Sequence, residues 1–265
     1  DHDYEVTVYP TRARLDCTRK VLEDAGRFDL VVCCGGDGTL NEMVSGMMQR
    51  QDRRPMGYIP LGSTNDLAVS LLYRDVGCRA MLEDHVTGNE FHMDVGTLND
   101  RYFNYIAAFG AFTETSYATP QEIKNALGHL AYILEGVKSL GKILPIHVKI
   151  TADDEQFEED YLFGAVTNTI SLGGVLKLDP EKVLLDDGMY ELLLVKNPTN
   201  ALEAQAMLTA IMTQNFDGPL VKMFHASDIT FESSHEISWT IDGEYGGTFS
   251  HTHILNNKNA VTLIV

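Results

Sequence analysis

Apolar positions in the first ninety residues form a regular succession of runs. Residues 28–34 and 56–61 are short continuous apolar stretches typical of buried strands, and 4–9 is rich in β-forming residues. Apolar residues at helical spacing occupy 17–26, which ends at a glycine, and recur at Leu40, Met43, Val44, Met47 and Met48 and over 67–72. This alternation predicts a parallel sheet with right-handed crossovers and ligand-binding loops at the carboxyl ends of its strands.

The pattern becomes β-rich from about residue 91. Residues 91–98 and 101–109 flank Asn99-Asp100 and predict a hairpin, and helical spacing returns only at 123–140 and 201–215. Further β-rich runs lie at 146–150, 161–169, 189–195, 228–232, 236–241 and 260–265. We therefore predict two lobes: an α/β domain over 1–92, onto which the C-terminal residues can pack back, and a β-rich domain with inserted helices over 93–265. The active site is expected in the cleft between them.

Composition agrees with a folded protein, because 44% of the 265 residues are apolar and 22% are charged. No stretch approaches the roughly 18–20 apolar residues of a membrane span, and residues 1–10 lack the pattern of a signal peptide. The sequence begins at Asp1 rather than Met, so we do not take Asp1 as the natural start. No C-x-x-C spacing occurs among Cys17, Cys33, Cys34 and Cys78, which favours free thiols over a disulfide or zinc site.

The formal net charge of −18 limits the classes of partner. It argues against nucleic acid, because a phosphate backbone requires a basic protein surface. A phosphate ligand or an anionic membrane would need local compensation by backbone amides, helix N-termini, a divalent cation or a membrane-facing patch that is not acidic.

Two polar loops follow the two buried strands. The first is Gly35-Gly36-Asp37-Gly38-Thr39-Leu40-Asn41-Glu42, in which glycines let backbone amides approach a ligand and the next helix offers its N-terminus to phosphate. The second is Pro60-Leu61-Gly62-Ser63-Thr64-Asn65-Asp66. Neither has Rossmann or Walker spacing. A glycine turn with Thr39 as a helix cap, and an N-cap box, would explain them without a ligand.

Five motifs in order resemble the diacylglycerol kinase catalytic fold, which sphingosine and ceramide kinases share. The two loops resemble its nucleotide loops, and Asp94-Val95-Gly96 with Arg101-Tyr102-Phe103-Asn104 resembles the opening of its second domain. Leu184-Leu185-Asp186-Asp187-Gly188-Met189 resembles its structural-magnesium segment, and Ile241-Asp242-Gly243-Glu244 resembles the segment that carries its catalytic carboxylate. The stretch 116–120 and the helix after it look most like Gram-positive diacylglycerol kinases. The similarity spans essentially the whole chain.

The resemblance implies roles for individual residues. ATP would contact Thr11, Gly35, Gly36, Asp37, Gly38, Thr39, Leu40, Asn41 and Ser63. Glu244 would be the catalytic base, and a structural Mg²⁺ would be held by the Asp187 carboxylate and the carbonyls of Leu184 and Met189. Asp37, Asp66 and Asp94 would form a polar network around metal and phosphate. Relatives begin with a strand and an Asn-Pro-x-Ser-Gly loop, and this sequence contains neither.

The predicted function is that of an ATP-dependent lipid kinase, a transferase of phospholipid metabolism. Glu244 would take the proton from the hydroxyl of diacylglycerol or a related glycerolipid, which attacks the γ-phosphorus in line, with a catalytic Mg²⁺ beside the structural one. Acyl chains would need an apolar cleft, with candidates that core packing would also explain: Phe109, Phe112, Tyr132, Ile133 and Leu134. The expected location is the cytoplasm, transiently at the inner membrane surface, and relatives commonly form a homodimer.

Two alternatives remain open. NAD kinases and phosphofructokinases also use Gly-Gly-Asp-Gly stretches, so the acceptor could be soluble. The chain could also be a catalytically silent nucleotide- or lipid-binding protein, and the intact Glu244 argues against this. Without the family, Asp242-Gly243 and Asp186-Asp187-Gly188 are explained as plain turns.

Overall fold

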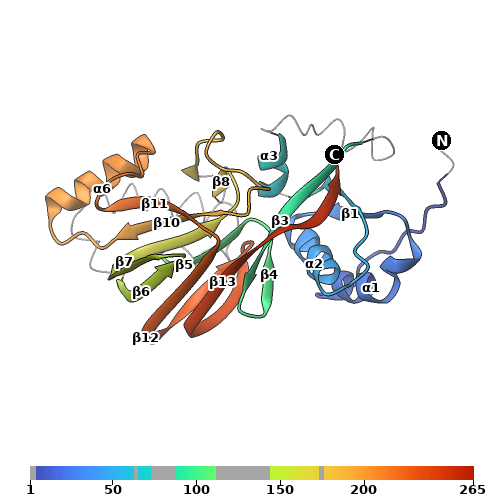
Figure 1. Cartoon of the computed structure of the whole chain (residues 1–265), viewed down its shortest axis with the longest axis horizontal. Helices are drawn as coiled ribbons and strands as arrows, with labels where there is room; N and C mark the ends of the chain where they lie inside the picture. Colours follow the sequence, from blue (N-terminus) through green and yellow to red (C-terminus); the bar gives the residue numbers. More distant parts are fainter. Residues whose placement is uncertain (1–3, 63–64, 73–87, 112–143, 173–175) are drawn as a thin grey trace.

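The structure is a computed structural model that describes residues 4–62, 65–72, 88–111, 144–172 and 176–265. Helices α1 (Asp16–Asp24) and α2 (Asp37–Met48) lie at one end of the elongated molecule and α6 (Ala201–Thr213) at the other, with a twisted array of strands between them (Figure 1). The described chain is therefore α/β and rich in strands.

The first seventy residues follow the predicted alternation. Strand β1 (Val31–Gly35) precedes α2, and β2 (Met56–Pro60) precedes α3 (Asp66–Leu72). The two strands pair in parallel, with Val31 opposite Met56 and Gly35 opposite Pro60. The predicted helix at 17–26 is α1 followed by the short 3-10 helix η1 (Ala25–Arg27).

The strand expected at 4–9 is absent, which corrects the prediction. Residues 4–12 belong to no regular element, and Val6 and Val8 are 76% and 82% exposed. A strand is stable only when a neighbour takes its backbone hydrogen bonds, and no described strand pairs with this segment. The β-forming residues alone did not decide its conformation.

The hairpin predicted around Asn99-Asp100 is confirmed, although its second arm is shorter than expected. Strand β3 (Glu90–Leu98) pairs with β4 (Arg101–Phe103), with Gly96 opposite Phe103. The chain then turns, and β5 (Ile106–Gly110) pairs with two other strands instead of continuing the hairpin. The break occurs where three successive backbone N–H groups, of Asn104, Tyr105 and Ile106, donate to the Asp242 carboxylate rather than to a strand.

Eleven strands of the described chain form one sheet, whose main path runs β1-β2-β13-β12-β5-β7-β10-β11. The remaining members are β6 (Ile146–Ala152), β7 (Glu155–Thr167), β10 (Tyr190–Lys196), β11 (Val221–Ala226), β12 (Asp228–Ile241) and β13 (Glu244–Ile264), and β8 (Ser171–Leu172) pairs separately with β9 (Leu176–Lys177). Sequence patterns did not predict β11, and of β13 they indicated strand only around His251 and His253 and over 260–265. Polar residues such as Asn256 and Asn257 interrupt the apolar alternation there.

Strand β13 connects the two ends of the molecule. At its start Glu244 lies opposite Ile241 of β12, and near its end Leu263 lies opposite Met56 of β2, in parallel. From Glu244 to Leu255 β13 pairs with β12, and from Ile254 to Ile264 it pairs with β3, with a register shift between Asn257 and Val261 in the second pairing. The C-terminal residues therefore pack back onto the N-terminal elements.

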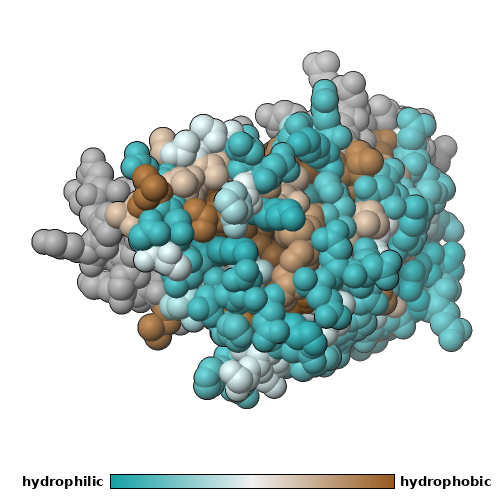
Figure 2. All heavy atoms as spheres, turned by 60° about the vertical axis from the view of Figure 1, so that its left-hand side comes forward, coloured by the Kyte–Doolittle hydropathy of each residue, from teal (hydrophilic) through white to brown (hydrophobic). Residues whose placement is uncertain are grey.

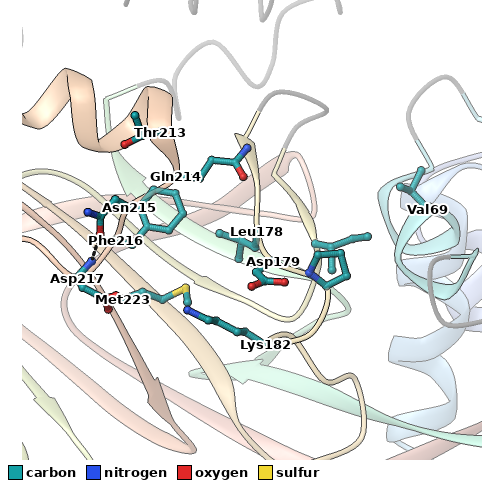
Figure 3. A pocket seen from close by; sticks show the side chains of 12 residues that line it. Val69, Leu178, Asp179, Lys182, Thr213, Gln214, Asn215, Phe216, Asp217 and Met223 are labelled. Atoms are coloured by element: carbon teal, nitrogen blue, oxygen red, sulfur yellow. Dashed lines mark hydrogen bonds between the residues drawn. The ribbon is translucent and has the colours of Figure 1, made fainter.

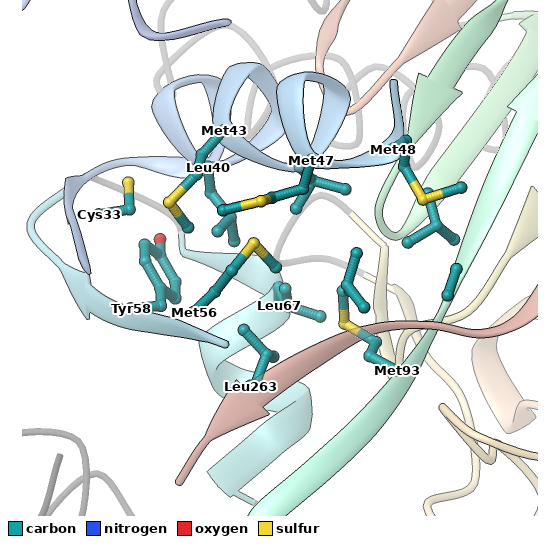
Figure 4. Close-up of a cluster of buried hydrophobic side chains, with 14 of the residues drawn as sticks. Cys33, Leu40, Met43, Met47, Met48, Met56, Tyr58, Leu67, Met93 and Leu263 are labelled. Carbon is teal, nitrogen blue, oxygen red and sulfur yellow. The ribbon is translucent and has the colours of Figure 1, made fainter. Parts of the chain in front are cut away.

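The N-terminal core lies between α2 and the strands beneath it. Leu40, Met43 and Met47 of α2 are fully buried against Met56 of β2, and Leu263 of β13 joins them from the other end of the sequence (Figure 4). Because the apolar residues of α2 recur every three or four positions, all of them face the sheet.

The strands of the second half bury both faces. On β10, Leu192 and Leu194 belong to one apolar cluster and Leu193 and Val195 to the other, as the two-residue period of a strand requires. Helix α6 covers the second cluster through Met207. Phe109 is fully buried with its ring 5.0 Å from that of Trp239, so it is part of the core rather than a wall of a lipid cleft.

Several sequence predictions lie outside the described residues. These are the helix at 123–140, Cys78, the hydroxyl residues Ser63 and Thr64, and the lipid-cleft candidates Phe112, Tyr132, Ile133 and Leu134. Within the described chain, the three cysteines are free, and burial raises the pKa of the Cys33 thiol to about 12; Cys34, on the other face of β1, is exposed. None of the described helices is both long and apolar enough to cross a membrane.

Candidate active site

The two predicted loops touch one another. The N–H of Leu61 donates to the carbonyl of Gly35 at 2.8 Å. A methyl group placed on Gly62 would lie 2.6 Å from the Cα of Gly36, which is closer than side-chain atoms approach a backbone. Glycine at position 62 therefore allows the loops to meet, and a Cβ on Gly36 would be a tight contact, 3.1 Å from the Cα of Gly62. The meeting follows from the parallel pairing of β1 and β2, whose carboxyl ends carry the loops.

The first loop leads directly into α2. Its N-cap is Gly36, and no side chain accepts a hydrogen bond from the first turn at this cap. Thr39 is therefore not the helix cap; it packs against Gly35, where an added Cβ would lie 2.9 Å from the Thr39 hydroxyl oxygen. The N–H groups of the first turn have no acceptor within the helix, and with the helix dipole they suit an anionic ligand.

Asp37 points to the second loop. Its partly buried carboxyl faces the backbone amides of Asn65, Asp66 and Leu67 at the start of α3. Burial raises the pKa of Asp37 and these amides oppose that shift. Asp66 is itself 3% exposed. Asp37 therefore links the two loops.

Asn65 closes the second loop. Its side-chain oxygen accepts from Gly62 N–H at 2.9 Å, and its amide nitrogen donates to the Gly62 carbonyl at 2.8 Å. The backbone of Asn65 has a φ of 52°, a conformation that asparagine tolerates better than most residues. These bonds fix the chain on both sides of the turn.

Asn41 contacts residues that lie far along the chain. Its amide nitrogen donates to Asp242 Oδ2 at 2.7 Å and to the Tyr102 carbonyl at 3.0 Å. Asp242 is 6% exposed and also accepts three backbone N–H bonds from the segment before β5. Burial raises the pKa of Asp242 to about 6, against these hydrogen bonds, which lower it. Sequence reasoning named Asp242 only as part of a turn and gave it no role, because a turn pattern carries no sign of burial.

Glu244 lies over the first turn of α2. The turn of Asp242 and Gly243, both at positive φ, carries the chain into β13 and directs the next side chain to the first loop. A Cβ added to Gly38 would lie 3.4 Å from Glu244 Oε1. The side chain is 56% exposed, so a substrate can approach it. The structure thus brings Glu244, at the start of β13, together with the first glycine loop.

A residue that sequence reasoning missed contacts this glutamate. Arg14 Nη2 donates to Glu244 Oε2 at 2.8 Å. The arginine lies in the segment before α1, which the carboxylate of Glu42 holds by accepting from Leu15 N–H at 2.7 Å and Cys17 N–H at 3.1 Å. Thr11, on the same segment, is exposed, and no hydrogen bond within the described residues joins it to the glycine loops.

The predicted metal segment is a tight turn fixed by its neighbours. Asp94 is fully buried and accepts from the N–H groups of Gly188 and Asn259, both at 2.7 Å, and burial raises its pKa. Asp187 Oδ1 accepts from Met189 N–H at 2.8 Å. Asp94 therefore positions the segment from β3.

Oxygen donors are available at this turn, although it has few carboxylates. Asp187 offers one carboxylate, and Leu184 and Met189 offer main-chain carbonyls, the second of which accepts from Asn256 at 3.2 Å. Within the described chain there is no group of three or more His, Cys, Asp or Glu that could hold a metal. An all-oxygen set with a single carboxylate is compatible with a cation that keeps much of its water, such as Mg²⁺.

A cavity of about 440 Å³ lies outside this group of residues (Figure 3). Val69 of α3 lines one side, Leu178 and Lys182 another, and Phe216 and Met223 the third. None of the predicted site residues borders it. On the face of the molecule shown in Figure 2, hydrophilic residues dominate and apolar residues are exposed only in smaller groups between them.

Two models of known protein families match this chain, one near each end. The model described as the diacylglycerol kinase catalytic domain matches residues 1–98, and the one described as the YegS C-terminal NAD kinase beta sandwich-like domain matches residues 112–264. The fold is accordingly a two-domain arrangement with a C-terminal β-sandwich-like domain.

Relatives named diacylglycerol kinase and solved structures are similar to this chain over most of its length. The diacylglycerol kinase of Bacillus subtilis (strain 168) is 32% identical over 96% of this chain and 87% of that protein. The diacylglycerol kinase of Staphylococcus epidermidis (strain ATCC 12228 / FDA PCI 1200) is 34% identical over 92% and 77%. A crystal structure of a diacylglycerol kinase from Bacillus anthracis str. Sterne aligns with a TM-score of 0.68 at 22% identity, over 96% of this chain and 82% of that one. A second chain from the same organism reaches 0.76 at 24%, over 96% and 83%. At these identities the two structures establish similarity of fold.

Proposed function

The chain belongs to the diacylglycerol kinase family, and from this premise we propose that it transfers the γ-phosphate of ATP to the hydroxyl of diacylglycerol or a related glycerolipid, with Glu244 as the general base. The observation that carries the proposal is the position of this carboxylate, over the first turn of α2 and within reach of the loop expected to hold the phosphates. A carboxylate in hydrogen-bond reach of a hydroxyl can accept its proton as the oxygen attacks phosphorus.

The nucleotide would lie along the two touching loops. The amides of the first turn of α2 would bind phosphate oxygens, because they have no acceptor within the helix and the helix dipole favours an anion there. Gly35, Gly36, Gly38 and the residues around them would contact ATP directly, and Ser63 and Thr11 stay predictions. Asp37 and Asp66 would hold the loops in register.

Transfer itself would be largely a matter of positioning. The hydroxyl oxygen forms a bond to the γ-phosphorus as the bond to the β–γ bridging oxygen breaks, and the hydroxyl proton goes to Glu244. Mg²⁺ that accompanies ATP would neutralise the β- and γ-phosphates when bound. A lipid acceptor would require the reaction to take place at a membrane surface, and we expect the substrate to enter between the proposed domains 1–92 and 93–265.

The test is product analysis with radiolabelled ATP and a panel of acceptors. The panel contains diacylglycerol and phosphatidylglycerol in micelles, with NAD and sugar phosphates as soluble competitors. We expect a lipid product, and Glu244→Gln should lower kcat by about 100-fold or more, the size of a general-base contribution. Glu181→Gln, the same change at an exposed residue of a distant turn, serves as the control.

Three results separate the alternatives. Phosphorylation of a soluble acceptor alone would favour an NAD-kinase-like activity. Equally low turnover of every acceptor in wild type and Glu244→Gln would favour a silent binding protein. Full activity of Glu244→Gln with a lipid would show that Glu244 is not the general base.

We also propose that the turn at 184–189 holds a structural Mg²⁺ through the Asp187 carboxylate and the carbonyls of Leu184 and Met189. The donor set supports this, because these oxygens leave room for the waters that Mg²⁺ retains. Added Mg²⁺ should raise the melting temperature of wild type and of Asp186→Asn, but not of Asp187→Asn. An equal rise in all three would exclude the turn as the site.

A further inference from the structure

An ion pair joins two segments that lie 230 positions apart and meet at the proposed site. Arg14 Nη2 donates to Glu244 Oε2 at 2.8 Å, and the two side chains are 69% and 56% exposed. Exposed ion pairs typically contribute little to stability. Stability alone therefore gives little reason for an arginine to lie against the proposed catalytic base.

The position of Arg14 is held by the fold. Leu15, the next residue, has a φ of 64°, a left-handed conformation that is unfavourable for a leucine. The Glu42 carboxylate stabilises this turn by accepting from Leu15 N–H and Cys17 N–H, and Arg12 N–H donates to Asp16 on the other side. The backbone around Arg14 is thus fixed to α2, the helix whose N-terminus the proposed phosphates would face.

The charge around this helix end is strongly negative. The carboxyl groups of Asp37, Asp242 and Glu244 belong to the same site, and the whole chain carries a net charge of −18. A polyphosphate would therefore need a cation close to the transferred group. Arg14 supplies this cation. Its guanidinium has five N–H donors, and the bond to Glu244 occupies one of them.

We infer that Arg14 is a further catalytic residue, whose remaining N–H donors bind oxygens of the transferred γ-phosphoryl group while Nη2 orients the Glu244 carboxylate. The inference rests on the proposed phosphoryl transfer. In that step the acceptor proton goes to Glu244, the new oxygen–phosphorus bond forms, and ADP leaves with the electron pair of the bond that breaks. Arg14 keeps its proton and stabilises the charge that spreads over the equatorial oxygens.

The first experiment separates catalysis from structure. Arg14→Ala should lower kcat by about 100-fold or more, since arginines that contact a transferred phosphoryl group contribute about 10³–10⁵ in related chemistry. Arg14→Lys should recover part of the loss, because it restores the charge but not the fork of donors. Arg12→Ala removes the same charge two residues away and should stay close to wild type.

Melting temperatures should be within a few degrees for all four proteins, because the pair is exposed. Arg14→Ala with a kcat equal to that of Arg12→Ala would overturn the inference. A loss of kcat in Arg14→Ala that is accompanied by a comparable loss of thermal stability would also overturn it.

The second experiment requires no lipid, so its outcome is independent of the acceptor. Calorimetry should show that Arg14→Ala weakens binding of ATP by about tenfold, the size of one lost charge-assisted contact, and leaves ADP unchanged. An equal effect on ATP and ADP would contradict a γ-phosphoryl contact. If wild type binds ATP but phosphorylates no lipid, the proposed acceptor is wrong, and the ATP–ADP comparison still decides the role of Arg14.

Discussion

Asp242 illustrates how a single buried group couples pH to stability. Its carboxyl accepts hydrogen bonds from Asn41 and from three backbone amides, yet burial is the larger effect and raises its pKa from 3.8 to about 6. The folded state therefore binds a proton more tightly than the unfolded state does. Between pH 4 and 6 the folded chain holds more protons, so this group loses stabilising effect as pH rises through its folded pKa.

We predict that wild type loses stability relative to Asp242→Asn as pH rises from 4 to 7. A shift of about two pKa units corresponds to ~3 kcal/mol at most. Urea unfolding of both proteins at several pH values gives the difference between their free energies of unfolding. The pH response of the other carboxyl groups is common to both proteins and cancels in this difference. A difference that stays constant over this range, or that favours wild type at higher pH, would show that burial does not raise this pKa.

The contact between Gly36 and Gly62 gives a second prediction at the same scale. An alanine Cβ at Gly62 would meet backbone at 2.6 Å and the Asn65 side chain at 2.7 Å, so Gly62→Ala must push the loops apart. We expect a loss of about 1–3 kcal/mol in stability and at least a tenfold weaker binding of ATP. Gly218→Ala is the matched control, because its Cβ would meet only an ordinary contact at 3.7 Å. An unchanged affinity for ATP in Gly62→Ala would show that the nucleotide does not bind at these loops.

Among the elements, α1 depends on a cap supplied by another helix. Its own N-cap, Leu15, has no side-chain hydrogen bond, and the carboxylate of Glu42 on α2 accepts from the amides there instead. Helix N-termini leave backbone N–H groups without a partner inside the helix, so an external acceptor stabilises them.

Glu42→Ala should therefore lower the free energy of unfolding by about 1–2 kcal/mol, the usual cost of a lost N-cap. The same change should lower kcat, because it loosens the segment that carries Arg14. Glu23→Ala, which removes an exposed partner of Arg19 on α1, should cost only about 0.3–0.5 kcal/mol. Chemical denaturation and initial-rate measurements check the two effects, and equal stability losses in the two variants would argue against the cap.

For the whole molecule, we expect β13 to make the two halves unfold together, because it pairs with β2 at one end and with β12 at the other. Leu263 is 1% exposed in the N-terminal core, whereas Trp239, the single tryptophan, is fully buried in the core of the second half. Leu263→Ala should cost about 2–5 kcal/mol by leaving a cavity. Tryptophan fluorescence and far-UV circular dichroism should then report the same lowered denaturation midpoint. If the fluorescence midpoint stays at the wild-type value, the two halves unfold independently.

The amino-acid sequence by itself determined the elements that depend on local pattern. The helical spacing of Leu40, Met43 and Met47 and the apolar runs of β1 and β2 place their elements to within a few residues. The ordered motifs also identified the family, because glycine loops and acidic turns are contiguous in the chain. A side chain's preference for helix or strand acts over a few neighbours, and such preferences are readable without coordinates.

Only the tertiary structure decided how distant segments meet. The predicted strand at 4–9 did not form, and the chain left the predicted hairpin at Asn104 before β5 began. The full length of β13 was not predicted either. In each case the pairing depends on which neighbouring strand accepts the backbone hydrogen bonds. The same holds at the proposed site. Asp242 and Arg14 carry no local signal of their roles, since burial and an ion pair across 230 positions arise only when β13 returns to the N-terminal helices.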